Sequence, residues 1–256
     1  MNRVTASILF SLVLGSASSV AMAKISIRPI PSSNVGGLMV FVGDDINRED
    51  LAALRKARGD MDRKHGANWR IIAKLNSRGG SVRAALEIGR ILRRVGAMAV
   101  VESDAICMSS CVYVLAGAAN RSVNGQVGIH RPYEPDGNET SASAQKQRYA
   151  KLGADVKEYF AEMNIPPKLY DDMLYISPED VRVLTGRELQ TYGLNQNDPF
   201  FEEADAVKQA QRLGISRAAL AERKAKANRE CPWDGDKSKE ALLKLLDCRS
   251  AIINGH

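Results

Sequence analysis

The sequence predicts an α/β protein with a mainly parallel sheet and a helical C-terminal tail. From Gly37 onward, short apolar runs that are typical of buried strands alternate with longer segments whose apolar residues recur at helical spacing. Such alternation indicates strand-helix-strand units, in which the strands run parallel. After Pro199 the composition shifts to Lys, Arg, Glu and Ala, which favour helix. With 45% hydrophobic residues among 256, the chain can fill a core, and a disordered chain is excluded.

The first 23 residues have the features of an export signal. Arg3 is their only charge, an apolar run spans 8–14, and an A-M-A triplet at 21–23 is a signal-peptidase site. The run is shorter than the ~20 residues that cross a bilayer, so a retained N-terminal anchor is the less favoured alternative. We therefore expect cleavage after Ala23 and a mature protein that is periplasmic or secreted.

The first half of the expected domain comprises strand 38–42, helix 47–61, strand 69–75, helix 84–95 and strand 98–101. Asn47 and Asp50 have the spacing of an N-terminal capping box, which fixes the start of the first helix. The two helices show apolar residues at helical spacing, so each is expected to cover the sheet with one face.

The second half comprises helix 110–118, strand 127–130, a polar loop 132–143, helix 145–163, and the tail helices 205–213 and 217–228. The loop is a candidate lid or insert because it is long and contains Pro, Gly and Asn. Five side chains of helix 145–163 are expected to face the core: Tyr149, Leu152, Val156, Tyr159 and Phe160. The predicted organisation is therefore a core domain over 24–200 and a C-terminal extension over 201–256.

The chain has four cysteines, an even number that in an exported protein indicates disulfides. Local pairing joins Cys231 to Cys248 and closes a segment near the C-terminus, with a stabilisation of ~3 kcal/mol in the chain-entropy model. A zinc site is the competing interpretation, but the spacings give no paired C-x-x-C, and His130 is the only histidine near a cysteine. No metal is predicted.

The formal net charge of +6 is spread over segments that also carry Asp and Glu, which is typical of a solvated surface. Nucleic-acid binding would require basic residues interleaved with aromatic ones on one face, and the 2 Trp, 7 Tyr and 5 Phe form no such stripe. We expect no nucleic-acid partner, although weak attraction to acidic envelope surfaces is compatible with this charge.

Three clusters of small or polar residues follow predicted strands, where open parallel sheets bind their ligands. They are N-S-R-G-G-S at 76–81, C-M-S-S-C at 107–111 and V-G-I-H-R-P at 127–132. Paired glycines let backbone N-H groups approach a ligand, and a serine at a helix start meets partial positive charge. Taken singly, each cluster has an ordinary interpretation as a turn, a helix cap or a structural histidine. A reactive serine needs a base, and His130 is the candidate.

In this order the three clusters resemble the Clp protease proteolytic subunit of the ClpP/crotonase superfamily. The serine motif is followed by V-Y-V-L-A-G-A at 112–118, and the likeness extends from about Gly37 to Leu194, closing with L-T-G-R-E-L and Y-G-L. The C-x-S-x-C form around Ser109 is most similar to the exported, periplasmic branch of this superfamily. The resemblance implies a fold of repeated β-β-α and βαβ units.

Carried over residue by residue, the resemblance makes Ser109 the nucleophile and His130 the base that takes its proton. The N-H groups of Gly80 and Ser110 would form the oxyanion hole, in which each donor lowers the barrier by roughly 3 kcal/mol. Ser110 is the alternative nucleophile, but the register of the following Tyr-Val-Leu-Ala run favours Ser109.

Two positions depart from the family pattern. The third catalytic residue, an aspartate in the family, falls on Val181 in this register, and the adjacent Asp180 is the candidate acid although strand neighbours point to opposite faces. Cys111 stands where the family tends to have glycine. A disulfide between Cys107 and Cys111 would straddle Ser109 and fix the turn in place of that glycine.

The resemblance implies an exported serine hydrolase without a cofactor, most simply a peptidase acting on peptide or protein substrates. A pseudoenzyme that serves as an envelope binding or assembly module is the alternative, and a serine-lysine dyad using Lys146 or Lys151 is a third hypothesis. An acyl-CoA enzyme is disfavoured because that cofactor is cytoplasmic. The resemblance also implies a homo-oligomer, and no ATPase partner is expected where there is no ATP.

Overall fold

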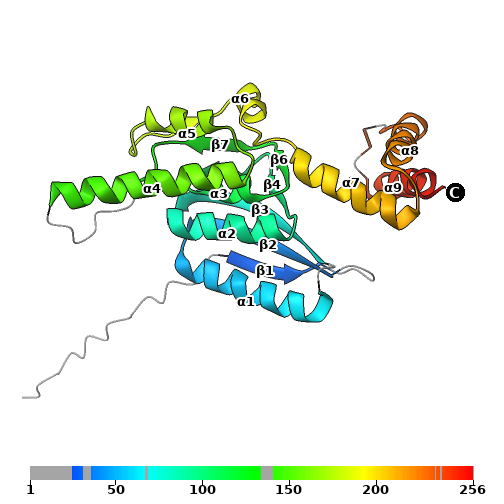
Figure 1. The fold of residues 1–256 in the computed structure, drawn as a ribbon, viewed down its shortest axis with the longest axis horizontal. Helices are drawn as coiled ribbons and strands as arrows, with labels where there is room; N and C mark the ends of the chain where they lie inside the picture. Colours follow the sequence, from blue (N-terminus) through cyan, green and yellow to red (C-terminus); the bar gives the residue numbers. More distant parts are fainter. Residues whose placement is uncertain are drawn as a thin grey trace, which may run out of the picture.

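The computed structural model describes residues 25–30, 36–66, 69–133, 141–233, 235–236 and 238–255. Figure 1 shows a sheet with helices packed beside it and a group of C-terminal helices that extends to one side. The expected export signal lies outside the described residues, as does most of the polar loop.

The strands are β1 (Ile25–Pro29), β2 (Gly36–Ile46), β3 (Trp69–Gly80), β4 (Met98–Val101), β5 (Ile106–Met108), β6 (Asn120–Val123), β7 (Gln126–Ile129) and β8 (Arg182–Val183). The helices are α1 (Arg48–His65), α2 (Val82–Arg94), α3 (Cys111–Gly117), α4 (Ala142–Glu162), α5 (Pro167–Leu174), α6 (Gly186–Thr191), α7 (Pro199–Leu213), α8 (Arg217–Glu230) and α9 (Lys239–Asn254).

These strands form one sheet that is parallel at its centre. Its main path runs β1-β2-β3-β5-β7-β8, and β4 pairs with β3 and with β6. The pairs from β2 to β7 and the two pairs of β4 are parallel, whereas β1 and β8 add to the ends of the path antiparallel. The predicted α/β class with a mainly parallel sheet is confirmed.

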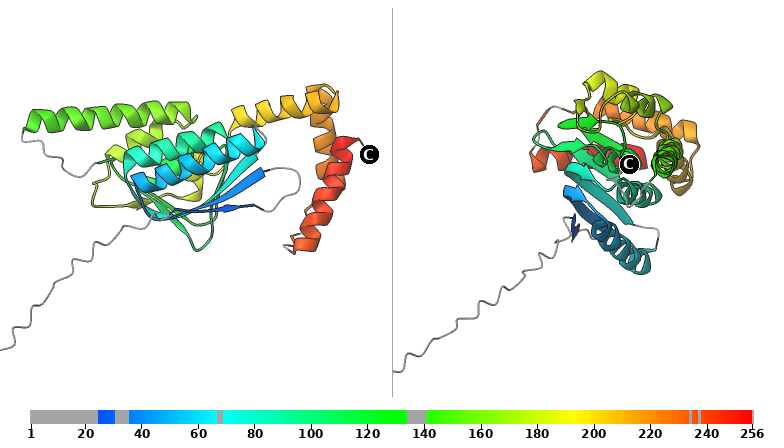
Figure 2. Two further views of the ribbon diagram at one scale, coloured as in Figure 1. Left: turned by 90° about the horizontal axis from the view of Figure 1, so that it is seen from below. Right: turned by 90° about the vertical axis from the view of Figure 1, so that its left-hand side faces the viewer.

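Strand β3 shows how one face of the sheet forms the core. Its residues alternate strictly, so that Trp69, Ile71, Ala73 and Leu75 are buried while the residues between them are exposed or half-buried. This period of two is that of a strand packed on one face. Helices α1 and α2 lie side by side along the packed face (Figure 2), and α3 is buried along its whole length.

Glycines bring α2 and α3 into close contact. A Cβ added at Gly117 would lie 2.4 Å from the Cα of Gly89, so neither residue can carry a side chain without moving the helices apart. The close approach fixes the C-terminal end of α3 against the middle of α2.

The expected elements are present, and most are longer than the sequence indicated. Asn47 caps α1 in the predicted capping box with Asp50. The expectation that Tyr149 points inward is wrong, because its side chain is 37% exposed. Helix α4 begins earlier than predicted, and its first turns project past the sheet, where there is no core to bury a side chain (Figure 2).

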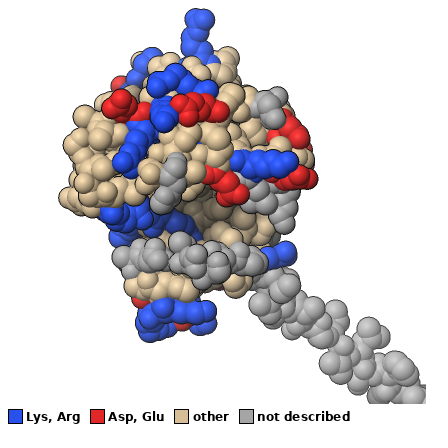
Figure 3. Space-filling view, turned by 90° about the vertical axis from the view of Figure 1, so that its right-hand side faces the viewer, with Lys and Arg blue, Asp and Glu red and all other residues tan. Residues whose placement is uncertain are grey.

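The C-terminal tail contains three helices rather than two. Helix α7 starts at Pro199 because Asp198 caps it, and α9 occupies part of the segment that the disulfide closes. The predicted Cys231–Cys248 disulfide is present, with its Cα atoms 6.1 Å apart. Figure 3 shows basic and acidic side chains intermingled on this side of the molecule, and Arg217 pairs there with Glu203.

None of the described helices is long and apolar enough to cross a membrane.

Candidate active site

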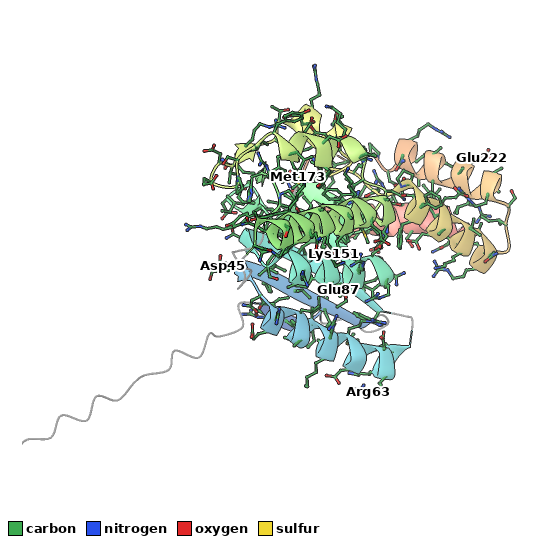
Figure 4. The ribbon with its side chains drawn as sticks, turned by 60° about the vertical axis from the view of Figure 1, so that its left-hand side comes forward. Asp45, Arg63, Glu87, Lys151, Met173 and Glu222 are labelled. Atoms are coloured by element: carbon green, nitrogen blue, oxygen red, sulfur yellow. A yellow bond between two sulfur atoms is a disulfide. The ribbon has the colours of Figure 1, made fainter. Side chains whose placement is uncertain are left out.

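A cavity of about 220 Å³ lies at the carboxyl ends of the central parallel strands. It contains residues from all three sequence clusters, which are far apart in the chain. Figure 4 shows Asp45, one of its residues, at one end of the sheet, with Arg63 near the opposite end of α1. The lining residues are Asp45, Arg78, Gly80, Val82, Ser109, Tyr113, His130, Pro132, Tyr133 and Val181.

Ser109 occupies a sharp turn between β5 and α3. Its φ of 55° lies in the left-handed region, which a residue with a side chain adopts only when its surroundings hold it there. Its N-H donates to the carbonyl of Gly128 at 2.9 Å. Gly79 lies against it, since a Cβ added at Gly79 would be 2.7 Å from the Ser109 Cβ and 3.1 Å from its Oγ. The turn therefore presents the Ser109 hydroxyl to the cavity.

The hypothesised disulfide between Cys107 and Cys111 is present and brackets this turn. The two Cα atoms lie 5.2 Å apart, and both side chains are fully buried. The bridge joins the end of β5 to the first residue of α3 and so closes the turn on the side away from solvent. It therefore restricts the backbone of Ser109.

His130 follows β7 directly and is buried, with 5% of its surface exposed. Its Nδ1 lies 2.9 Å from the carbonyl of Arg131. A carbonyl can only accept, so the neutral ring carries its proton on Nδ1, and Nε2 is the basic nitrogen. The ring packs on that of Tyr133 at a centroid distance of 5.7 Å. The imidazole is thus held in the tautomer that a general base requires.

The two predicted oxyanion residues lie beside Ser109, in different surroundings. Gly80 lines the cavity with a φ of 131°, and a Cβ there would lie 2.4 Å from the carbonyl oxygen of Ile46. The Ser110 N-H has no acceptor among the described residues. Its hydroxyl oxygen is buried without a partner there, whereas Ser109 opens to the cavity, so the two serines are not equivalent.

Asp180 is not brought to the cavity. It is exposed, and Val181 lines the cavity instead, as the strand register suggested. In the part of the chain that the structure describes, His130 has no carboxylate partner within 4.0 Å.

The alternative bases on α4 do not line the cavity either. Lys146 and Lys151 are exposed, and Lys151 pairs with Asp155 at 3.1 Å.

Glu179 is a carboxylate near His130 that the sequence did not single out. A hydrogen bond from the Ser177 hydroxyl is the main cause that lowers the pKa of Glu179, and its own backbone N-H and the charges of Arg131 and His130 act in the same direction. The side chain is exposed, and Glu179 does not line the cavity.

Tyr113 also lines the cavity and was missed because its position in an apolar helix predicts only packing. Its ring is fully buried against those of Tyr159 and Phe160, and burial raises the pKa of its hydroxyl. The phenol is a neutral hydrogen-bond donor at the wall of the cavity.

No group of three or more His, Cys, Asp or Glu side chains suited to a metal ion occurs within the described ranges.

No protein-family model and no curated protein matches the chain. Among solved structures it is similar to a serine-to-alanine mutant of the membrane-bound stomatin-specific protease 1510-N, with 17% identity over 64% of this chain and 79% of that one and a TM-score of 0.45. It is also similar to an asparagine-to-aspartate mutant of ClpP1 from Listeria monocytogenes, with 18% identity over 61% of this chain and 88% of that one and a TM-score of 0.49. These likenesses concern the fold alone.

Proposed function

We propose that this protein is an exported serine peptidase that acts by acylation of Ser109, with His130 as general base. The observation that carries the proposal is that Ser109, held in a left-handed turn, and His130, held in the Nδ1-protonated tautomer, line one cavity. The catalytic domain would span 24–200, and 201–256 would be an extension. The substrate would be a peptide or protein segment laid across the cavity, and the working form a homo-oligomer.

In the proposed reaction, Nε2 of His130 takes the proton of the Ser109 hydroxyl as its oxygen attacks the scissile carbonyl. The developing oxyanion would be held by the N-H groups of Gly80 and Ser110. Collapse of the tetrahedral intermediate breaks the C–N bond, and the imidazolium gives its proton to the leaving amine. Water then attacks the acyl-enzyme with the help of the same histidine and releases the acid.

The carbonyl of Arg131 takes the place that a carboxylate occupies in a Ser-His-Asp triad. It fixes the tautomer of the imidazole, but a neutral oxygen stabilises the imidazolium less than a full negative charge does. We therefore expect a functional but slow enzyme. Glu179 supplies negative charge at longer range.

A fluorophosphonate probe tests this assignment, because it phosphonylates only an activated serine. The wild type should be labelled and Ser109→Ala should not be. His130→Ala should be labelled more slowly than the wild type by at least ~10²-fold. Ser110→Ala tests the alternative nucleophile: it removes the buried hydroxyl but keeps the backbone N-H of the proposed oxyanion hole, so labelling should persist. Equal labelling of the wild type and Ser109→Ala would refute the assignment.

The lack of a carboxylate partner for His130 among the described residues also supports a second candidate, a pseudoenzyme that binds proteins in the cell envelope. This function predicts no labelling under any condition, together with saturable binding of peptide by the wild type and by Ser109→Ala alike.

A further inference from the structure

Arg78 is the extra residue of a β-bulge, and it lines the same cavity as Ser109. Strand β2 pairs Asp44 with Ser77, but its next residue, Asp45, pairs with Gly79. Arg78 therefore opposes no residue of β2. Bulges of this kind occur next to active sites, where they redirect a side chain.

The bulge is held by a buried hydroxyl. Ser77 is 1% exposed; its Oγ donates to the carbonyl of Asp44 and accepts the Gly79 N-H at 3.1 Å. Gly79 and Gly80 both have positive φ, and Gly80 has no room for a Cβ. The backbone thus fixes the direction in which the Arg78 side chain leaves the strand, and this direction is toward the cavity.

Nothing in the described part of the fold uses the Arg78 guanidinium. It takes part in no hydrogen bond or ion pair there, in contrast to Arg93, which pairs with the buried Asp198 at 2.9 Å. Asp45 lines the same cavity, yet its carboxylate and the guanidinium of Arg78 form no ion pair within 4.0 Å in the described ranges. The cavity thus presents one cation whose donors are available to a ligand.

We propose that Arg78 binds a substrate carboxylate beside the cleaved bond, so that the enzyme selects peptides that present a carboxylate at that position. This inference rests on the proposed function and names its substrate class. A guanidinium offers parallel donors that match a carboxylate bidentately. The carboxylate could be an Asp or Glu side chain or a free C-terminus. Asp45 places a negative charge in the same cavity, which opposes the attraction of Arg78 and weakens the binding of a carboxylate.

Alanine hexapeptides carrying a single Glu or a single Gln, each made as the free acid and as the amide, distinguish these sources. Their binding to Ser109→Ala is measured by calorimetry and their cleavage by the wild type by mass spectrometry. A charge-assisted bidentate contact should favour the preferred carboxylate about 10- to 100-fold over its neutral counterpart. Preference for Glu over Gln indicates a side-chain carboxylate, and preference for acid over amide indicates the C-terminus.

Arg78→Gln should abolish the preference, Arg78→Lys should restore part of it, and Asp45→Asn should increase it. Arg70→Gln changes an exposed arginine of the same strand that does not line the cavity, and it should leave the preference intact. Equal binding of charged and neutral peptides by Ser109→Ala, or a preference that survives Arg78→Gln, would overturn the inference. Binding that depends on Arg78 without any cleavage would contradict the peptidase function and leave the inference standing.

Discussion

At the residue scale, the position of the nucleophile depends on a glycine one strand away. Ser109 occupies a left-handed backbone conformation in contact with Gly79, whose own φ is 114°. Both features come from the packing of β3 against the turn. The glycine was visible in the sequence only as part of a tight connection, because its closeness to Ser109 exists only in the folded chain.

Replacing Gly79 by alanine should therefore impair the site directly. The new Cβ would lie 2.7 Å from the Ser109 Cβ and 3.0 Å from the Met108 carbonyl oxygen, and the residue would be strained at its positive φ. We expect Gly79→Ala to lower the free energy of unfolding by about 1–3 kcal/mol and the fluorophosphonate labelling rate at least ~10-fold. Chemical denaturation and labelling kinetics measure the two effects.

Gly186→Ala is the matched control. No atom lies within 4 Å of a Cβ at Gly186, and its φ is not positive, so stability should be unchanged or slightly increased and labelling unaffected. If Gly79→Ala labels as fast as this control, the contact between Gly79 and Ser109 has no part in positioning the nucleophile.

How far the site could be predicted also differs from residue to residue. Ser109 and His130 were identifiable from their sequence clusters and from the family resemblance. His130 ends the predicted strand 127–130, whereas Ser109 follows β5, a strand that the sequence did not predict. Parallel strands gather their carboxyl ends at one edge, which brings the two residues together. Arg78 was not identifiable, because a bulge leaves no mark in the hydrophobic pattern. The Arg131 carbonyl as the partner of the His130 ring was not predictable either, since a backbone atom can serve this role from any residue type.

At the scale of elements, the turn between β5 and α3 combines the Cys107–Cys111 disulfide with the left-handed backbone of Ser109. We expect the disulfide to hold Ser109 in that conformation. Breaking the bridge in the double variant Cys107→Ser/Cys111→Ser should reduce stability only by about 2 kcal/mol, because the closed loop is short. Among the molecules that remain folded, the labelling rate should still fall at least ~10-fold, because Ser109 is then free to leave its left-handed φ. Labelling kinetics at equal folded fraction make the comparison.

The control is the other disulfide. Cys231→Ser/Cys248→Ser removes the same number of sulfur atoms from the C-terminal extension, away from the cavity, and should leave the labelling rate unchanged. Equal labelling of both double variants and the wild type would show that the Cys107–Cys111 bridge does not position Ser109.

Helix α6 begins with a capping box that makes stability depend on pH. The backbone N-H of Thr185, then Arg182 and the Thr185 hydroxyl, lower the pKa of Glu188 to about 2. Because the folded state depresses this pKa, the stabilisation is fully present above the ordinary value near 4.5 and is lost as pH falls through about 2.

Glu188→Gln should therefore lower the free energy of unfolding by about 1 kcal/mol at neutral pH, a typical value for a cap. The difference from the wild type should shrink below pH 4.5 and vanish near pH 2, as measured by denaturation at a series of pH values. A deficit that stays constant over this range would mean that the charge of Glu188 is irrelevant.

The elements themselves were largely predictable, since the alternation of strand and helix periods holds through most of the core. Strand β3 was expected to end at Leu75 and continues to Gly80, because its last residues are polar or glycine and are held by the bulge instead of by apolar burial. Short elements escaped prediction because two to eight residues carry too little pattern. They are β1, β5, β6, β8, α5 and α6.

At the scale of the whole molecule, one buried carboxylate joins the start of α7 to the region of α2 and α4. Asp198 caps α7 and accepts hydrogen bonds from Arg93 of α2 at 2.9 Å and from Asn164, just after α4, at 3.2 Å. Arg121 lies 3.8 Å away, and it also donates to three carbonyls, including that of Gly193 at 2.6 Å. The network connects elements from both halves of the chain.

Asp198→Asn should destabilise the protein by about 3 kcal/mol, because it leaves Arg93 and Arg121 as charges without their acid in a buried setting. Burial alone would raise the pKa of Asp198, but the hydrogen bond and charge of Arg93, with Asn164 and a backbone N-H, bring it below its ordinary value. Its stabilisation is thus complete above pH ~4 and is lost as pH falls further.

Glu203→Gln is the control: it removes an exposed partner of Arg217 and should change stability by less than ~1 kcal/mol. Urea denaturation of the two variants at pH 7 and pH 3 measures the free energy of unfolding. Equal small losses of both variants at pH 7 would mean that the extension is joined to the core by apolar contacts rather than by this charge. A deficit of Asp198→Asn that is unchanged at pH 3 would mean the same.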